Sequence, residues 1–239
     1  MNRLWFWFNG TDSRDMGVYL TEPLEIPAAE RQMRFEEVPG RDGALSIDQG
    51  AYLDVDATLE GFMQNGGNMG AVRAWMQGAG DLMLSTDTTR FYKARVVGEV
   101  ETPRTARGLG TRNLTVPMRV SPFRYHVEAE DGDDAEITTS PHTLTNPGTY
   151  RSAPRIKVEG TGNVVLTIGT QVVEIEGLED GIIIDSELGD CFNLTESALL
   201  NGKVTLMDED FPMLAPGANI ISWTGNVTKV TVTPRWRDL

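Results

Sequence analysis

The chain has 239 residues, of which 40% are hydrophobic, and a formal net charge of −14 at pH 7. This length is enough for one large domain or two ordinary domains with packed cores. The acidic balance argues against stable nucleic-acid binding, because phosphate backbones are held by basic surfaces. The single cysteine, Cys191, excludes an internal disulfide and a cysteine-based zinc site, and we expect it to pack as a small apolar residue.

No apolar stretch of the sequence has the length of a secretion signal or a membrane helix. The run near the N-terminus, residues 4–8, contains five apolar residues. A secretory core needs roughly 7–15 apolar residues and a membrane helix about 18. We therefore expect a soluble protein that carries no export signal and does not associate with membranes.

The charge is distributed unevenly along the chain. Residues 1–127 carry 14 basic and 16 acidic side chains, a net of −2, whereas residues 128–239 carry 7 basic and 19 acidic side chains, a net of −12. Such asymmetry predicts two domains with different surroundings.

In chain order, the first expected elements are a strand at residues 4–8, a short strand at 18–21 and an irregular stretch at 22–30. Extended residues at 33–38 and 45–48 then flank a tight turn.

This turn consists of Gly40, Arg41, Asp42 and Gly43. The glycines permit backbone angles that other residues resist, and the two residues between them place opposite charges at the tip. The sequence thus predicts a hairpin with a charged tip, which is either an ordinary surface turn or a contact turn.

Residues 54–60 alternate strictly, with Val55, Ala57 and Leu59 on one side and acids or threonine on the other. A period of two indicates a half-buried strand. The acidic row could hold a metal, but a solvated strand face is the favoured interpretation.

One short helix is expected after residues 65–68. Asn68 can cap it by accepting a hydrogen bond from a free backbone amide. Apolar side chains then fall on one face at helical spacing, and Gly78 and Gly80 end the helix; these side chains are Met69, Val72, Trp75 and Met76. We expect them to plug a β-sandwich core and not to bind a ligand.

Three further strands are expected at residues 81–84, 91–97 and 114–120. Pro117 has no amide hydrogen to donate to a sheet, so its part of the last strand should lie at an edge or a bulge.

The loop at 102–112 contains arginines and no acid, namely Arg104, Arg107 and Arg112. It is either a solvated loop or a basic contact with an acidic neighbour, and the sequence leaves both open.

The second half begins with an acidic, glycine-containing stretch in residues 128–145. Its oxygen atoms would suit Ca²⁺, but the spacing of a calcium loop is missing, so a solvated linker is favoured.

From residue 146 onward, short strands recur with turn signals between them, including the glycine-containing segments 160–163 and 225–226. This spacing predicts an all-β sandwich, so the expected fold is mainly β, with two β-sandwich domains and one short α-helix in the first.

Several segments of the first half resemble the distal tail protein (Dit) family of siphophages, the long-tailed phages with non-contractile tails. They are Phe8-Asn9-Gly10, residues 13–18, the turn at 38–43, the helix with Trp75, residues 91–94 and residues 116–125. In the second half, residues 146–154, 184–186, 211–214 and 216–220 resemble the family's galectin-like domain.

The resemblance implies a structural virion protein of a phage or prophage. The domain at 1–127 would close into a ring of six copies, residues 128–145 would form the linker, and residues 146–239 the galectin-like domain. The ring would join the tail tube to tail-associated, fibre or baseplate proteins at the tail tip, after assembly in the host cytoplasm. The turn at Gly40–Gly43 and the arginines of the basic loop are then candidate subunit or partner contacts.

No catalytic pattern stands out. His126 and His142 are the only histidines, and neither belongs to a triad or metal-ligand motif. A phosphate-binding loop and a dinucleotide fingerprint are also missing. We therefore expect a protein that is not an enzyme and has no cofactor.

The alternative function is a carbohydrate-binding module in host recognition. Its candidate sugar contacts are Trp223 and Trp236, because a sugar ring stacks on an exposed aromatic side chain. The alternation of Trp223 with Ile221 favours a core position for the former.

Overall fold

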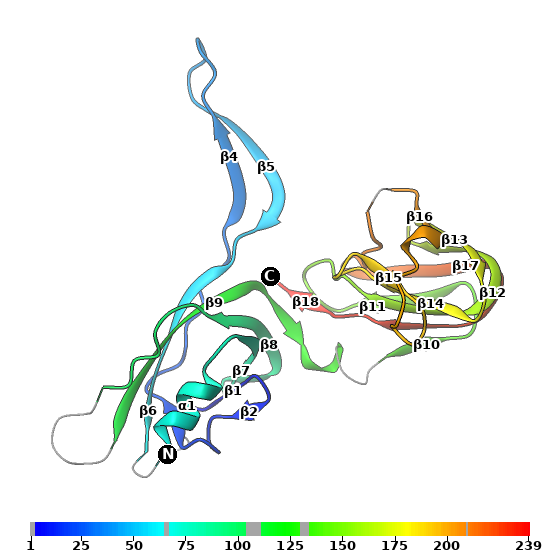
Figure 1. The fold of residues 1–239 in the computed structure, drawn as a ribbon. Coiled ribbons are helices and arrows are strands. Elements are labelled where there is room, and N and C mark those ends of the chain that lie inside the picture. The colour runs from blue at the N-terminus through cyan, green and yellow to red at the C-terminus, as the bar shows by residue number, and fades with distance from the viewer. Residues whose placement is uncertain (1–2, 65–66, 104–110, 130–133, 209) are drawn as a thin grey trace. The chain divides into compact units, whose positions relative to one another are not determined.

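The structure is a computed structural model that describes residues 3–64, 67–103, 111–129, 134–208 and 210–239. It divides into two compact units, one formed by residues 1–124 with Leu239 and the other by Tyr125–Asp238. Each unit has its own hydrophobic core. The described part is mainly β and contains a single α-helix, so the predicted fold class is confirmed (Figure 1).

The first unit is built on one antiparallel sheet with the strand order β2-β1-β7-β8-β9-β6-β3. Its strands are β1 (Phe6–Phe8), β2 (Thr11–Asp12), β3 (Val18–Leu20), β6 (Val55–Met63), β7 (Ala79–Leu84), β8 (Asp87–Val96) and β9 (Arg112–His126). The predicted alternation holds in β6, where Val55 and Leu59 are buried while Asp56 and Glu60 are exposed, as is Asp54 just before the strand. The acidic row is therefore a solvated face.

The helix α1 (Met69–Trp75) covers the inner face of this sheet. The side chain of Asn68 accepts a hydrogen bond from the amide of Ala71 at 3.2 Å, as the capping prediction requires. Trp75 stacks on Phe6 with ring centroids 5.5 Å apart, and its Nε1 donates to the carbonyl oxygen of Phe8 at 2.7 Å. The helix thus plugs the core, as expected.

Pro117 does not lie at a sheet edge, because β9 runs between β8 and β6. On the β8 side, regular pairing ends at this proline. The amide of Val97 donates to the Pro117 carbonyl, and the next hydrogen-bonded pair joins Glu101 to Thr115. β8 ends at Val96, so the missing proline donor coincides with the end of the pairing between β8 and β9.

The second unit is organised around two long strands, β12 (Arg155–Ile168) and β17 (Gly217–Thr233). The main sheet order is β10-β17-β12-β13-β16, with β11 beside β17, β14 beside β12 and β15 beside β14. These strands are β10 (Ala135–Ile137), β11 (His142–Asn146), β13 (Gln171–Leu178), β14 (Gly181–Asp185), β15 (Asp190–Phe192) and β16 (Val204–Leu206). Two 3₁₀ turns, η1 (Val127–Ala129) and η2 (Asn201–Lys203), and the short β18 (Arg237–Asp238) complete the elements.

Two sequence expectations for this unit differ from the structure. The glycine-containing segments at 160–163 and 225–226 do not reverse the chain; they lie inside β12 and β17, where the pairing register shifts. A Cβ on Gly160 would lie 2.3 Å from the Asn226 carbonyl oxygen, so glycine permits close strand approach there. The stretch 128–145, expected as a linker, contributes β10 and most of β11, because both pair with β17.

The third sheet consists only of β4 (Arg31–Glu36) and β5 (Leu45–Tyr52), which pair with each other and, among the described residues, with no other strand. We call this hairpin, residues 31–52, the arm (Figure 1). It is the hairpin that the sequence predicts, although β4 covers Arg31–Glu36 in place of the expected 33–38 and β5 continues to Tyr52 in place of residue 48.

Candidate functional site

The arm exposes apolar side chains on both of its faces. Cross-strand partners share a face, and Phe35 pairs with Ser46 while Arg34 pairs with Ile47. Phe35 is 68% exposed and Ile47 is 39% exposed. Met33 lies on the face of Phe35, and Leu45 lies on the face of Ile47. A two-stranded hairpin is marginally stable in water by itself, so these surfaces suit a partner that covers them.

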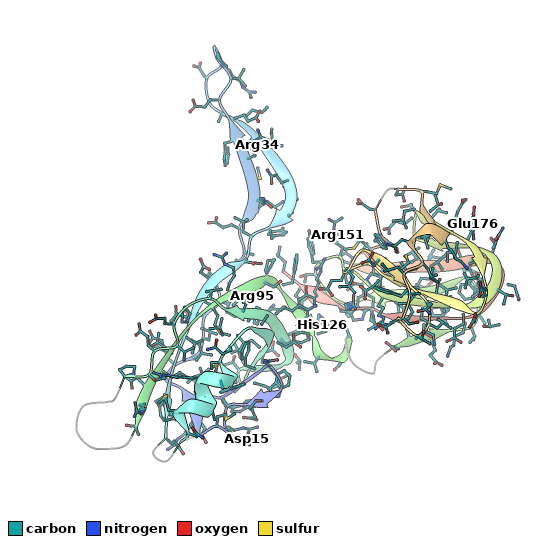
Figure 2. All side chains as sticks on the ribbon, in the orientation of Figure 1. Asp15, Arg34, Arg95, His126, Arg151 and Glu176 are labelled. Atoms are coloured by element: carbon teal, nitrogen blue, oxygen red, sulfur yellow. The ribbon has the colours of Figure 1, made fainter. Side chains whose placement is uncertain are left out.

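Ion pairs stiffen both faces of the arm. Arg31 contacts Asp48 at 2.9 Å and lies over the ring of Tyr52. Arg34, which is labelled on the arm in Figure 2, contacts Glu36 at 2.5 Å. Exposed ion pairs of this kind add little free energy, because water screens the two charges.

The predicted turn lies at the tip of the arm. Gly40 and Gly43 have φ values of +82° and +77°, which side chains with a Cβ rarely adopt. The amide of Arg41 donates to the carbonyl oxygen of Val38 at 3.1 Å. Arg41 and Asp42 are both exposed, so the tip presents two opposite charges to its surroundings.

The structure describes the basic loop only at its two ends, residues 102–103 and 111–112. Arg104 and Arg107 lie outside the described residues. Arg112 begins β9, pairs with Met63 and directs its guanidinium to the carbonyl of Thr102 at 3.5 Å. The proposed contact role of this loop remains a prediction.

The two tryptophans that were candidate sugar contacts have different surroundings. Trp236 is 9% exposed and belongs to the core of the second unit. Trp223 on β17 is half-buried and packs against the same core. Its backbone is also tied to the hydroxyl of Ser140, which contacts both the amide and the carbonyl of Trp223.

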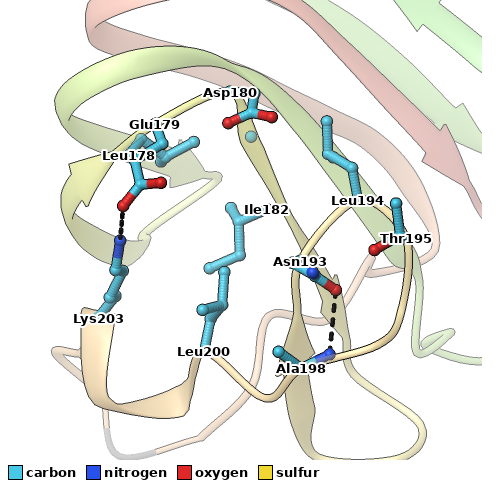
Figure 3. Close-up of a pocket in the computed structure, with 11 residues that line it drawn as sticks. Leu178, Glu179, Asp180, Ile182, Asn193, Leu194, Thr195, Ala198, Leu200 and Lys203 are labelled. Carbon is cyan, nitrogen blue, oxygen red and sulfur yellow. Dashed lines mark hydrogen bonds and ion pairs between the residues drawn. The ribbon is translucent and has the colours of Figure 1, made fainter.

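A polar-rimmed pocket of about 260 Å³ lies in the second unit between the β13–β14 turn and the loop that follows β15 (Figure 3). Leu178, Ile182, Leu194 and Leu200 form apolar walls. At the rim, Lys203 donates to the carbonyl of Gly177 at 2.8 Å and lies 3.6 Å from Glu179. The lining contains no histidine or aromatic residue, so it offers neither an imidazole base nor a stacking platform for a sugar.

The groups that most resemble catalytic residues have structural partners. The Nε2 atom of His126 lies 3.0 Å from Asp238, and that carboxylate also accepts the amide of Thr149. Burial raises the pKa of the Cys191 thiol to about 11, which keeps it protonated and unreactive at neutral pH. Within the described ranges, no group of three or more His, Cys, Asp or Glu side chains is arranged to hold a metal ion.

Sequence reasoning missed one surface of the first unit. Phe6 and Phe8 point into the core, so the alternating side chains Trp5 and Trp7 point outward and are half-buried. Tyr19 stacks on Phe62 from the neighbouring strand β6 at 5.9 Å. The alternation of the N-terminal aromatic residues was the available signal, but the sequence alone did not place β1 and β3 near each other.

Among the helices of the described residues, none has the length and apolar character needed to cross a bilayer.

Comparisons with known proteins agree with this architecture. No family model matches the chain, and no curated protein matches it. Among solved structures, the chain is similar over 100% of both lengths to SPP1 Dit (gp 19.1), with a TM-score of 0.64 and 14% sequence identity. That protein is described as a paradigm of the hub adsorption apparatus in phages that infect Gram-positive bacteria. The chain therefore has the Dit fold along its whole length, and the resemblance predicted from the sequence is confirmed at the level of the fold.

Proposed function

We propose that this protein is the distal tail hub of a siphophage or prophage, a structural virion protein that forms a hexameric ring at the tail tip. The exposed arm is the observation that carries this proposal, since its apolar side chains are open to solvent and no other described strand pairs with its edges. The shared fold with a phage hub protein supports the same conclusion.

A ring is a natural way to cover such an arm. Each copy gives its arm to one neighbour and receives the arm of the other, which is the head-to-tail geometry of cyclic oligomers. Covering an exposed Phe, Leu, Ile or Met side chain contributes roughly 1.5–3 kcal/mol. The arm side chains are between 37% and 68% exposed, so we expect on the order of 1 kcal/mol from each.

In this role the ring joins the tail tube on one side to tail-associated, fibre or baseplate proteins on the other. The protein assembles in the host cytoplasm and resides at the tail tip of the virion. It acts through binding alone, without enzymatic activity or a cofactor. The tip at Gly40–Gly43 and the arginines at 104, 107 and 112 are its proposed contacts with subunits or partners.

The first test is the solution mass of the purified protein, measured by light scattering at several salt concentrations. We expect a hexamer, or a mixture of monomer and hexamer. The double variant Phe35→Ser/Ile47→Ser should shift this equilibrium to monomer, since it removes one apolar contact from each face of the arm.

Leu199→Ser is the control, because Leu199 is 61% exposed, close to the 68% of Phe35, but lies in the second unit. If the control dissociates the ring as strongly as the arm variant, or if the arm variant stays hexameric, the arm is not the ring contact. A wild-type protein that stays monomeric at high concentration would contradict self-assembly and favour the other candidate function.

That second candidate is a carbohydrate-binding module. It has less support, because Trp236 is buried and the pocket of the second unit lacks an aromatic side chain. Reproducible binding of the purified protein on a glycan array would favour it over the hub.

A further inference from the structure

The pocket of the second unit is small and has apolar walls (Figure 3). Its volume of about 260 Å³ lies below the roughly 300–1,000 Å³ of typical small-molecule pockets. Leu178 and Ile182 belong to the core of the unit, whereas Leu194 and Leu200 are half-buried and reach the surface. A cavity of this kind suits a single apolar side chain of a protein partner better than a whole small molecule.

One wall of the pocket, the loop that follows β15, is held in shape by Asn193. The Oδ1 atom of this residue accepts the amides of Ser197 at 2.9 Å and Ala198 at 3.2 Å, and its Nδ2 donates to the hydroxyl of Ser197 at 3.0 Å. Figure 3 shows the bond to Ala198 at the edge of the pocket. A pocket that exists before binding costs little ordering entropy when it is filled.

The opposite wall approaches this loop closely because it contains a glycine. A Cβ on Gly181 would lie 2.9 Å and 3.0 Å from the two δ carbons of Leu194, and 2.5 Å from the carbonyl oxygen of Val158. Leu194 therefore packs directly on the backbone of β14. The apolar wall is continuous from this strand to the loop after β15.

The charges that line the pocket favour a basic neighbour. Lys203 is already engaged, because it donates to the Gly177 carbonyl and lies 3.6 Å from Glu179. Among the described residues, no hydrogen bond or ion pair joins the Asp180 side chain to another residue. Asp180 is also exposed, and residues 128–239 carry 19 acidic but only 7 basic side chains. A partner that approaches the pocket thus meets an uncompensated carboxylate.

We propose that this pocket binds a segment of another virion protein in which an apolar side chain stands next to a lysine or arginine. The apolar side chain enters between the four walls, and the basic side chain pairs with Asp180 at the rim. An apolar anchor in a pocket with polar groups around it is the usual centre of a protein interface. The source of the segment rests on the proposed hub function, whereas the pocket itself lies within one unit of one chain.

Peptide binding to the full-length protein tests this proposal. The probe is a short fluorescein-labelled peptide that has a leucine between two arginines and otherwise contains glycine and serine. By fluorescence anisotropy, we expect it to bind at least about tenfold tighter than the same peptide with serine in place of leucine. Its affinity should fall as salt is added, and replacing both arginines by glutamates should abolish binding.

A variant that fills the pocket provides the matching protein control. Ala198 is exposed and lines the pocket, so Ala198→Trp should weaken peptide binding at least about tenfold. Ala218→Trp, at an exposed position of β17 outside the lining, should bind as the wild type does. Thermal unfolding of both variants verifies that each is folded. Equal affinities of the two variants would overturn the proposed site.

The charge contribution has a control of its own. Asp180→Asn should weaken binding about threefold, since an exposed ion pair contributes little. Asp15→Asn removes the same charge from an exposed position of the first unit and should leave the affinity unchanged. If the two variants lose affinity equally, the attraction comes from net charge and not from the rim of the pocket.

Covalent mapping locates the bound peptide without any variant. A probe that carries a diazirine analogue of leucine is bound to the wild-type protein, irradiated and analysed by mass spectrometry. We expect the adducts in residues 178–182 and 193–200, which contain most of the lining. Adducts that concentrate in other segments would overturn the proposal.

Light scattering of the same samples separates the failure of this proposal from that of the hub. A ring that binds the leucine peptide no better than the serine peptide overturns the pocket and leaves the hub standing. Specific binding to a protein that stays monomeric supports the pocket and contradicts the ring. A ring that dissociates in Ala198→Trp but not in Ala218→Trp would assign the pocket to a second copy of this chain and overturn the proposed partner.

Discussion

Arg235 and Asp185 form a buried ion pair that ties the C-terminal segment of the second unit to the end of β14. The two nitrogens of the guanidinium contact the two carboxylate oxygens at 2.7 Å and 2.9 Å, and Asp185 is 3% exposed. The same carboxylate accepts the backbone amides of Glu187 and Leu188. Removing one partner of such a pair leaves the other charge buried without compensation.

We therefore expect Arg235→Met to lower the free energy of unfolding by about 3 kcal/mol at pH 7, measured by urea denaturation. Arg155→Met is the matched control, because Arg155 pairs with Glu196 at the surface, and its loss should cost less than about 1 kcal/mol. Equal losses in the two variants would show that burial does not set the strength of the Arg235 pair.

The pH dependence follows from the same pair. Burial raises the pKa of Asp185, but the hydrogen bonds from Arg235 and the backbone amides outweigh this effect and hold the pKa below its usual 3.8. The pair therefore stabilises the fold above the unfolded pKa and loses this contribution as the pH falls through the folded value. In Arg235→Met the carboxyl is easier to protonate, so the difference from wild type should shrink in acid.

At the scale of single elements, α1 depends on its cap more than a longer helix would. It spans only Met69–Trp75, and isolated helices of that length are unstable in water. Asn68→Ala removes the hydrogen bond to Ala71 and should cost about 1 kcal/mol in unfolding free energy.

Asn68→Ser keeps an oxygen acceptor at the cap and should stay within about 0.5 kcal/mol of wild type. Near-UV circular dichroism of the variants reports on Trp75, whose stacking on Phe6 depends on the helix position. A stable Asn68→Ala variant would mean that the packing of Trp75, and not the cap, fixes the start of the helix.

At the scale of the whole molecule, the two cores suggest that each unit is an independent folding unit. The core of the second unit draws only on residues between Ala129 and Trp236. We expect a fragment of residues 125–239 to give a β-sheet circular dichroism spectrum and a cooperative thermal transition.

The full chain should then show a thermal transition at the same temperature as the fragment. Arg235→Met should lower the midpoint temperature of this transition only. A fragment without a cooperative transition would show that the second unit needs the first in order to fold. Either result tests the domain division predicted at residues 127–146, which lies close to the boundary of the compact units at Arg124 and Tyr125.

The sequence predicted those features that depend on neighbouring residues. The alternation of 54–60 identified a half-buried strand, and Asn68 with the apolar spacing after it identified the helix. Glycine signals were less reliable, because Gly160 and Gly225 permit close approach between strands and do not reverse the chain there. In the acidic stretch of 128–145, the local charge favoured a linker. The strands β10 and β11 form there because they pair with β17, which lies far away in the sequence.

By itself, the sequence determined the β-rich class, the two-part organisation, the short helix, the charged hairpin tip and the resemblance to the Dit family. These follow from local periodicity, turn chemistry and the order of motifs. Only the tertiary structure decided which apolar side chains stay exposed, since burial depends on what lies opposite in space. The arm alternates much as a buried hairpin would, yet no other described strand pairs with it. Likewise, Trp5 and Tyr19 became one surface only when β1 and β3 were brought side by side.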